Sequence, residues 1–258
     1  MTALPADARL TYGSYLRLDQ LLALQCPRSA PMVPDELLFI TVHQVFELWV
    51  KVLLFELEGA RDDMLAGRTT APRTRLDRCR RIERILLDQF DVLDSMQAPD
   101  FERFRTALGT ASGAQSAQFL EVEFLSGLKD RDYAQRRDWL TAAEHEVLRR
   151  RLAEPCLWEA FLVVLGDAGF DTSTRQLRSE AYLAIARDRE KYGALWDLQE
   201  AMVGHDQSWS LWRARHALTV ERQIGTKIGT NGSAGASFLR ARFGLRFYPE
   251  LWEMRSRL

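Results

Sequence analysis

Two histidines in apolar helical surroundings are the side chains of this chain best suited to chemistry. His43 lies within the apolar run 37–46. His216 shares one helical face with residues that recur at spacings of three and four: Trp209, Trp212, Val220 and Gln223. A neutral imidazole in such surroundings is suited to bind a metal or to make one directed hydrogen bond. Taken alone, the surroundings of His43 or of His216 also fit a structural histidine that is buried and hydrogen-bonded to a neighbouring side chain.

A glycine-rich segment follows the helix of His216. That helix is expected to end at Gly225, and residues 229–235 then read Gly-Thr-Asn-Gly-Ser-Ala-Gly. A segment of this composition does not pack a core, but its N–H groups and hydroxyls are suited to cover a ligand. Earlier in the chain, Arg105 lies four residues after Phe101 on a short predicted helix. Nothing in its local sequence excludes an ordinary surface arginine.

Composition narrows the class of protein. The 258 residues are 47% hydrophobic and carry a net charge of −1, which favours neither nucleic acid nor an anionic membrane as a partner. The cysteines Cys26, Cys79 and Cys156 are far apart, so we expect free thiols in a reducing cytoplasm. The chain shows no signal-peptide pattern and no uninterrupted apolar run of about 18 residues, so neither secretion nor a membrane span is expected.

Helical periodicity accounts for nearly the whole chain. Pro34, followed by two acidic residues, is typical of a helix start, and this helix is expected to reach about Ala66. Its run 37–46 is apolar on every side, which predicts burial all round. Residues 128–138 are predicted to be a surface excursion. No run alternates with period two, so we predict an all-α helical bundle, one domain over 1–258, without a sheet. Further helical segments are expected at 11–25, 70–96, 100–108, 115–125, 141–153, 156–165, 179–189, 192–202, 209–225 and 237–244.

Taken together, these stretches resemble the tryptophan 2,3-dioxygenase family over nearly the whole chain. The order and spacing of many short pieces carry the resemblance. It implies the all-helical fold of the tryptophan and indoleamine dioxygenases, a bound haem b and a homotetramer. The pieces are YGSYL at 12–16, DELLFI at 35–40, HQ at 43–44, ELW at 47–49, FR at 104–105, LG at 108–109, SG at 112–113, QS at 115–116, QF at 118–119, WR at 212–213, His216, Val220, Arg222, IG at 224–225, GT at 229–230 and Gly232.

The resemblance also implies a role for each candidate residue. His216 would be the iron ligand, and His43 would be the distal catalytic histidine that holds the indole N–H. Further haem contacts would come from Ser112, Gly113 and Trp212. The substrate would be bound by Phe39, Phe101, Arg105 and Thr230, and by Tyr12, Tyr15 and Leu16 from the N-terminal segment 1–33 of a neighbouring subunit.

The chain departs from the family pattern at several positions. The family usually has His, Tyr, Phe, Arg and Gly where this chain has Pro34, Phe101, Ala114, Leu120 and Asn231. The proposed iron ligand and distal histidine are not among these positions. The departures therefore concern the exact substrate and product more than the cofactor.

The resulting prediction is oxidation of L-tryptophan or a close analogue by haem and O₂, which opens the indole C2–C3 bond to an N-formylkynurenine. One alternative is an enzyme of secondary metabolism that adds a single oxygen to a β-substituted tryptophan, such as β-methyltryptophan, to give a 2-oxindole. Another is a haem-binding protein without turnover, which has no need of Arg105, Thr230 and His43 together. A third is a helical scaffold. His145 and His205 are predicted to be surface or structural residues.

Overall fold

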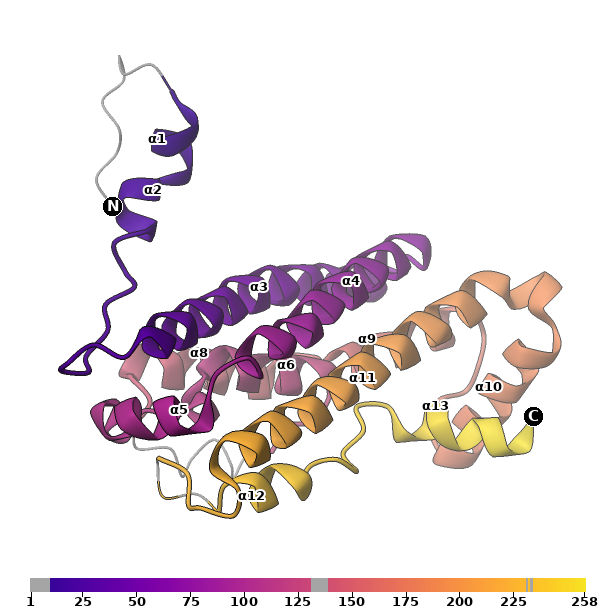
Figure 1. The fold of residues 1–258 in the computed structure, drawn as a ribbon. Helices are drawn as coiled ribbons and strands as arrows, with labels where there is room; N and C mark the ends of the chain where they lie inside the picture. Colours follow the sequence, from indigo (N-terminus) through magenta and orange to yellow (C-terminus); the bar gives the residue numbers. More distant parts are fainter. Residues whose placement is uncertain (1–9, 131–138, 231, 233) are drawn as a thin grey trace.

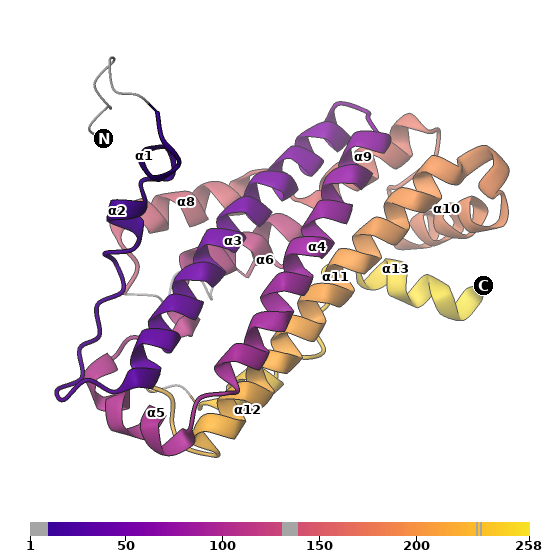
Figure 2. The same ribbon diagram turned by 45° about the horizontal axis from the view of Figure 1, so that its top comes forward.

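Three long helices form the body of the molecule (Figure 1). The computed structural model describes residues 10–130, 139–230, 232 and 234–258. Helices α3 (Pro34–Leu65) and α4 (Thr70–Leu93) form a hairpin, and α11 (Arg189–Ile224) packs along α4. Figure 2 shows the three side by side. The described residues contain no strand, and the predicted all-α class is confirmed.

Shorter helices cover the ends and one face of this layer. Helices α6 and α9 pack against α3, and α10 and α12 pack against α11. The remaining elements are α1 (Tyr12–Leu16), α2 (Leu18–Leu21), α5 (Ala98–Arg105), η1 (Thr106–Leu108), η2 (Gly113–Gln115), α6 (Ala117–Ser126), α8 (Ala142–Ala153), α9 (Leu157–Asp167), α10 (Arg175–Arg187), α12 (Ala236–Arg240), α13 (Pro249–Glu253) and η3 (Met254–Arg257).

Helix α3 begins where its start signals predicted. Pro34 occupies the first turn, and the Glu36 carboxylate accepts hydrogen bonds from the backbone N–H groups of Arg28 and Ser29 at 2.7 and 2.9 Å. The expectation that 37–46 is buried all round is wrong for the single chain, because Leu37 is 44% exposed. Helices α4, α6 and α9 cover only part of the α3 circumference.

The exposed part of α3 carries several large apolar side chains. By length and composition this helix could cross a membrane, but the core helix of a soluble protein passes the same test, so the observation is weak evidence. Leu48, Val52 and Phe55 are exposed on it at helical spacing, and Phe55 is 64% exposed. The single chain therefore leaves an apolar stripe uncovered.

Helix α11 is longer than its sequence pattern suggested. The predicted segments 192–202 and 209–225 are one helix, with non-helical backbone angles only at Tyr192. The helix passes through Gly204, where the Arg80 side chain packs so closely that an added Cβ would come within 2.6 Å of it. A single glycine inside a helix costs only about 1 kcal/mol relative to alanine.

Two adjacent residues in the middle of α11 anchor it to the rest of the bundle. His205 is fully buried, and its Nδ1 lies 2.5 Å from Glu83 Oε1 on α4 while its Nε2 lies 2.9 Å from Ser126 Oγ on α6. His205 is therefore structural, whereas His145 is exposed. Asp206 Oδ2 accepts three hydrogen bonds from the C-terminal segment, from the backbone N–H of Phe247 and Tyr248 and from Trp252 Nε1.

The N-terminal helices α1 and α2 lie away from the bundle in both views (Figures 1 and 2). Tyr12 and Tyr15 are 76% and 71% exposed, and Leu16 is also exposed. Large apolar side chains in this number rarely remain exposed in a stable assembly. This exposure is consistent with α1 and α2 packing against another molecule rather than against their own bundle.

Candidate functional site

One large cavity opens where α3, α4, α5 and the last turns of α11 come together. It encloses about 1340 Å³, a volume that includes the space at its open mouth. Tyr12, Tyr15 and Leu16 do not line it. Every other predicted site residue does: Phe39, His43, Phe101, Arg105, Ser112, Gly113, Trp212, His216 and Thr230.

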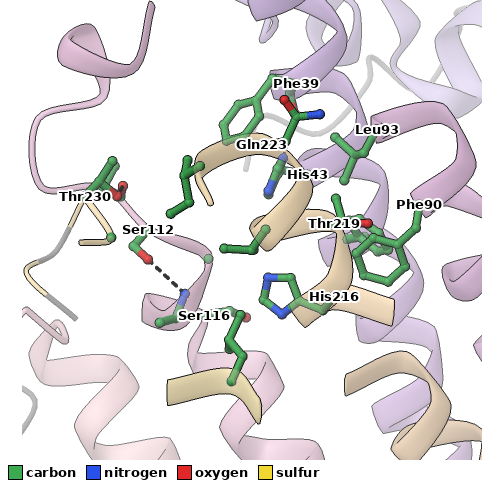
Figure 3. Close-up of a pocket in the computed structure, with 18 of the residues that line it drawn as sticks. Phe39, His43, Phe90, Leu93, Ser112, Ser116, His216, Thr219, Gln223 and Thr230 are labelled. Atoms are coloured by element: carbon green, nitrogen blue, oxygen red, sulfur yellow. Dashed lines mark hydrogen bonds between the residues drawn. The ribbon is translucent and has the colours of Figure 1, made fainter. Parts of the chain in front are cut away.

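The two histidines reach the same space from different helices. Figure 3 shows His43 from α3 and His216 from α11 directed into the cavity. Burial lowers the pKa of His216 to about 4, and the nearby His43 adds to the shift. The His216 ring makes no hydrogen bond within the part of the chain that the structure describes. It is therefore a neutral imidazole with a nitrogen lone pair available to a metal.

The tautomer of His43 follows from its one hydrogen bond. Its Nδ1 lies 2.7 Å from the Phe39 carbonyl oxygen. A carbonyl can only accept, so Nδ1 carries the proton and Nε2 is an acceptor. Burial lowers the pKa of His43, and the hydrogen bond to Phe39 and the charge of Glu47 oppose this shift in part. His43 is thus neutral at pH 7 and has one acceptor nitrogen to offer a ligand.

Aromatic rings form the walls between the histidines. Trp212 contacts Phe90 and Phe119, with ring centroids 5.5 and 5.1 Å apart, and Phe90 stacks on His216 at 5.9 Å. On the other side, Phe39 packs on His43 at 4.1 Å. These contacts make flat apolar surfaces that suit a planar ligand.

The mouth of the cavity is polar. An Nη of Arg105 donates to the carbonyl oxygen of Ile228, in the loop that follows α11, and a second Nη lies 3.7 Å from Glu102. In the same loop, the Thr230 hydroxyl donates to the Ala111 carbonyl at 2.5 Å. With its proton engaged, the hydroxyl oxygen of Thr230 is left as an acceptor. The mouth therefore offers cationic donors and a neutral acceptor side by side.

A short 3₁₀ turn, η2, brings backbone to the cavity wall. The Ser112 hydroxyl accepts from the Ala114 N–H at 3.3 Å, and the Gln115 side chain accepts from the Ser112 N–H at 3.1 Å. This reciprocal cap fixes Ser112 and Gly113 at the wall. Beside Ala114, a side chamber of about 460 Å³ continues as far as Arg213 and Arg242.

Comparison with known proteins decides the family. The tryptophan 2,3-dioxygenase family model matches residues 4–165 and 142–258. A tryptophan 2,3-dioxygenase from Nocardioides sp. is 49% identical over 97% of this chain and 96% of its own length. This chain belongs to the tryptophan 2,3-dioxygenase family. Relatives of the same name from Myxococcus xanthus and Herpetosiphon aurantiacus are each 37% identical, over 97% and 96% of this chain and 90% and 98% of their own lengths.

Membership of the tryptophan 2,3-dioxygenase family confirms the predicted resemblance and the predicted class, an oxidoreductase. The family is haem-dependent in general, and the side chains that line the cavity fit a haem on two counts. The aromatic walls of the cavity at Trp212, Phe90 and Phe119 are apolar. His216 supplies a neutral nitrogen without a competing partner.

Thr219 and Gln223 are polar residues of the cavity without a predicted role. Both lie on the turns of α11 after His216, and their buried atoms Thr219 Oγ1 and Gln223 Oε1 have no hydrogen-bond partner among the residues that the structure describes. Gln223 lies on the predicted face of His216, so the periodic pattern found its position. The pattern did not show that this face borders a cavity, because that depends on how α3, α4 and α5 pack against α11.

Proposed function

We propose that this protein is a haem-dependent tryptophan 2,3-dioxygenase that oxidises L-tryptophan with O₂ and opens the indole C2–C3 bond to N-formylkynurenine. The observation that carries the proposal is that one cavity brings together a neutral His216, an acceptor nitrogen of His43 and the polar mouth at Arg105 and Thr230. The close relatives named tryptophan 2,3-dioxygenase support it.

His216 would hold the haem iron, and Ser112, Gly113 and Trp212 line the same cavity. Bound there, haem supplies the iron centre at which O₂ is activated. The protein contributes position and a dry environment, since the aromatic walls exclude water from the reacting indole.

His43 orients the indole. Its Nε2 accepts a hydrogen bond from the indole N–H, because Nδ1 is already the donor to Phe39. This neutral hydrogen bond fixes the ring and requires no proton transfer to His43. Phe39 packs on His43 and offers its face to the indole ring.

Arg105 and Thr230 hold the amino-acid end of tryptophan. The guanidinium pairs with the substrate carboxylate, and the Thr230 oxygen accepts from the ammonium group, since its own proton is bound to Ala111. Phe101 packs on Phe39 at 5.9 Å and adds only apolar contact at this end. Arg105 therefore carries most of the carboxylate recognition.

The active form is a homotetramer of single-domain subunits, 1–258, in the cytoplasm. The exposed Tyr12, Tyr15 and Leu16 support this proposal, because they would be covered if the N-terminal segment packed at the cavity of a neighbouring subunit. The exposed apolar stripe of α3 supplies a second surface for subunit contact.

Product mass under isotope-labelled O₂ tests the proposed reaction. Purified protein is reconstituted with haem, reduced, and supplied with L-tryptophan or β-methyltryptophan. We expect tryptophan to give N-formylkynurenine with two labelled oxygen atoms. A product with one labelled atom from either substrate contradicts dioxygenation and supports the 2-oxindole reaction. Haem binding without any product supports a protein without turnover.

A further inference from the structure

Gln223 presents a buried acceptor to the cavity. Its Nε2 donates to the backbone carbonyl of Met96 at 3.3 Å. Because that carbonyl can only accept, it fixes which end of the amide faces it, and Oε1 points elsewhere. Oε1 is shielded from solvent and has no partner among the described residues. A buried acceptor without a donor is unfavourable, so this position calls for a ligand that donates.

The position of Gln223 shows which part of a substrate it would meet. Figure 3 shows Gln223 on the same side of the cavity as His43 and Phe39, whereas Thr230 lies on the opposite side. If tryptophan binds as proposed above, its carboxylate and ammonium are at Arg105 and Thr230, and its indole N–H is at His43. The benzo ring then extends beyond His43, away from the mouth and toward Gln223. This step depends on the proposed function.

The surroundings restrict the chemistry of the donor. Met96, which accepts a hydrogen bond from Gln223, and Phe39, which lines the same cavity, have apolar side chains, and a charged donor would be costly to bury among them. We propose that the cavity selects tryptophans that carry a neutral hydrogen-bond donor, such as a hydroxyl, on the benzo ring, and that Gln223 Oε1 accepts this hydrogen bond. The oxidation itself is unchanged, so Gln223 is a specificity-determining residue.

A substitution that removes only the acceptor tests this inference. Gln223→Met keeps the length and volume of the side chain, and Gln223→Leu serves as a second variant if the first binds haem poorly. For haem-loaded protein, the dissociation constant is measured from the change in the haem spectrum, and kcat/KM from turnover. The ligands are tryptophan and 4-, 5-, 6- and 7-hydroxytryptophan.

We expect the wild-type protein to favour at least one hydroxytryptophan over the other isomers. Gln223→Met should weaken binding of that isomer and lower its kcat/KM by about three- to tenfold, the effect of one neutral hydrogen bond. Tryptophan should bind the variant equally well or better, because the variant leaves no buried acceptor without a donor.

Thr219→Val is the matched control. Thr219 is on the same helix, lines the same cavity and has a buried hydroxyl without a partner, but Figure 3 shows it beside Phe90. We expect any effect of this change to be equal for tryptophan and the favoured hydroxytryptophan. A selective loss in Thr219→Val without one in Gln223→Met overturns the assignment to Gln223.

The two proposals fail in different ways. If Gln223→Met changes all ligands by the same factor, Oε1 is satisfied by water or by the protein, and the inferred selectivity is wrong while tryptophan oxidation stands. If haem-loaded wild-type protein neither binds nor oxidises tryptophan or any hydroxytryptophan, the proposed function itself is wrong.

Discussion

At the scale of single residues, hydrogen-bond partners separate the two cavity histidines. His43 is oriented by a hydrogen bond to the Phe39 carbonyl, whereas the His216 ring has no hydrogen-bond partner among the described residues. An oriented imidazole with one acceptor nitrogen suits a hydrogen bond to a substrate, and an unpaired neutral imidazole suits a metal. The division of roles therefore follows from local contacts.

The depressed pKa of His216 predicts a pH dependence for the haem-free protein. Its pKa is about 4 in the folded state against 6.5 for an exposed histidine. Between these values the unfolded chain binds more protons at this site, so stability falls as pH drops through the window. Replacing His216 with Phe should make the loss of unfolding free energy between pH 7 and pH 4.5 smaller by roughly 2–3 kcal/mol. Denaturant unfolding at pH 7 and at pH 4.5 measures it, and equal losses in both proteins would rule out the buried neutral state.

Arg105 binds the substrate carboxylate in the proposed complex, because Phe101 has no polar side-chain atom to contribute. Loss of a bidentate, charge-assisted pair should cost about 2–4 kcal/mol, so we expect Arg105→Ala to lower kcat/KM for tryptophan roughly 30- to 1000-fold. Arg105→Lys keeps the charge without the fork and should recover only part of the loss. Indole, which lacks the carboxylate, is the control ligand. A haem-loaded alanine variant within about threefold of wild type would place the carboxylate elsewhere.

At the scale of elements, α11 positions the site because it carries both the buried anchor residues, His205 and Asp206, and the cavity residue His216. Glu83 and Ser126 hold His205, and Asp206 holds the C-terminal segment. These contacts fix α11 against α4 and α6. His216, three helical turns further on, is positioned by the same helix.

Breaking the anchor should destabilise the fold strongly. His205→Ala leaves the Glu83 carboxylate buried without its donor, which typically costs 3–5 kcal/mol. Ser126→Ala removes one neutral hydrogen bond and should cost only about 0.5–1.5 kcal/mol. Denaturant unfolding of both variants gives the comparison. Similar small losses in the two would show that Glu83 is not a buried charge held by His205.

The helices were largely predictable because their ends carry local signals. Pro34 and Gly225 mark the limits of α3 and α11, as their sequence patterns indicated. The continuity of α11 between the predicted segments was not predictable, since the long contact of α11 with α4 is not visible in a local pattern. In the site, the family pattern named residues that do line the cavity. It did not reveal the Gln223 amide oxygen, which has no partner among the described residues, because that depends on contacts between helices.

At the scale of the whole molecule, the exposed apolar side chains support the proposed contact with other subunits. Phe55 and Val52 are exposed on α3, and Ile85 and Val92 are exposed on α4, which packs beside it. Large apolar side chains that remain exposed in this number are typical of subunit interfaces. The proposed tetramer would cover them.

A charge on this surface should therefore change the assembly. We expect Phe55→Glu to lower the molar mass in light scattering from that of a tetramer to that of smaller species, because a carboxylate buried in an apolar interface is costly. Glu146→Lys on α8, also a change at an exposed site, is the control. Wild-type protein that is monomeric at micromolar concentration would contradict the proposed assembly.

The absorption spectrum of reconstituted His216 and His43 variants tests the central claim most directly, since the claim is that one cavity histidine binds haem iron and the other binds substrate. Wild-type protein, His216→Ala and His43→Ala are loaded with haem and titrated with tryptophan. We expect His216→Ala to lack the spectrum of imidazole-ligated haem, and His43→Ala to keep it while binding tryptophan more weakly. An imidazole-ligated spectrum in His216→Ala, or loss of haem from His43→Ala, would contradict the assignment.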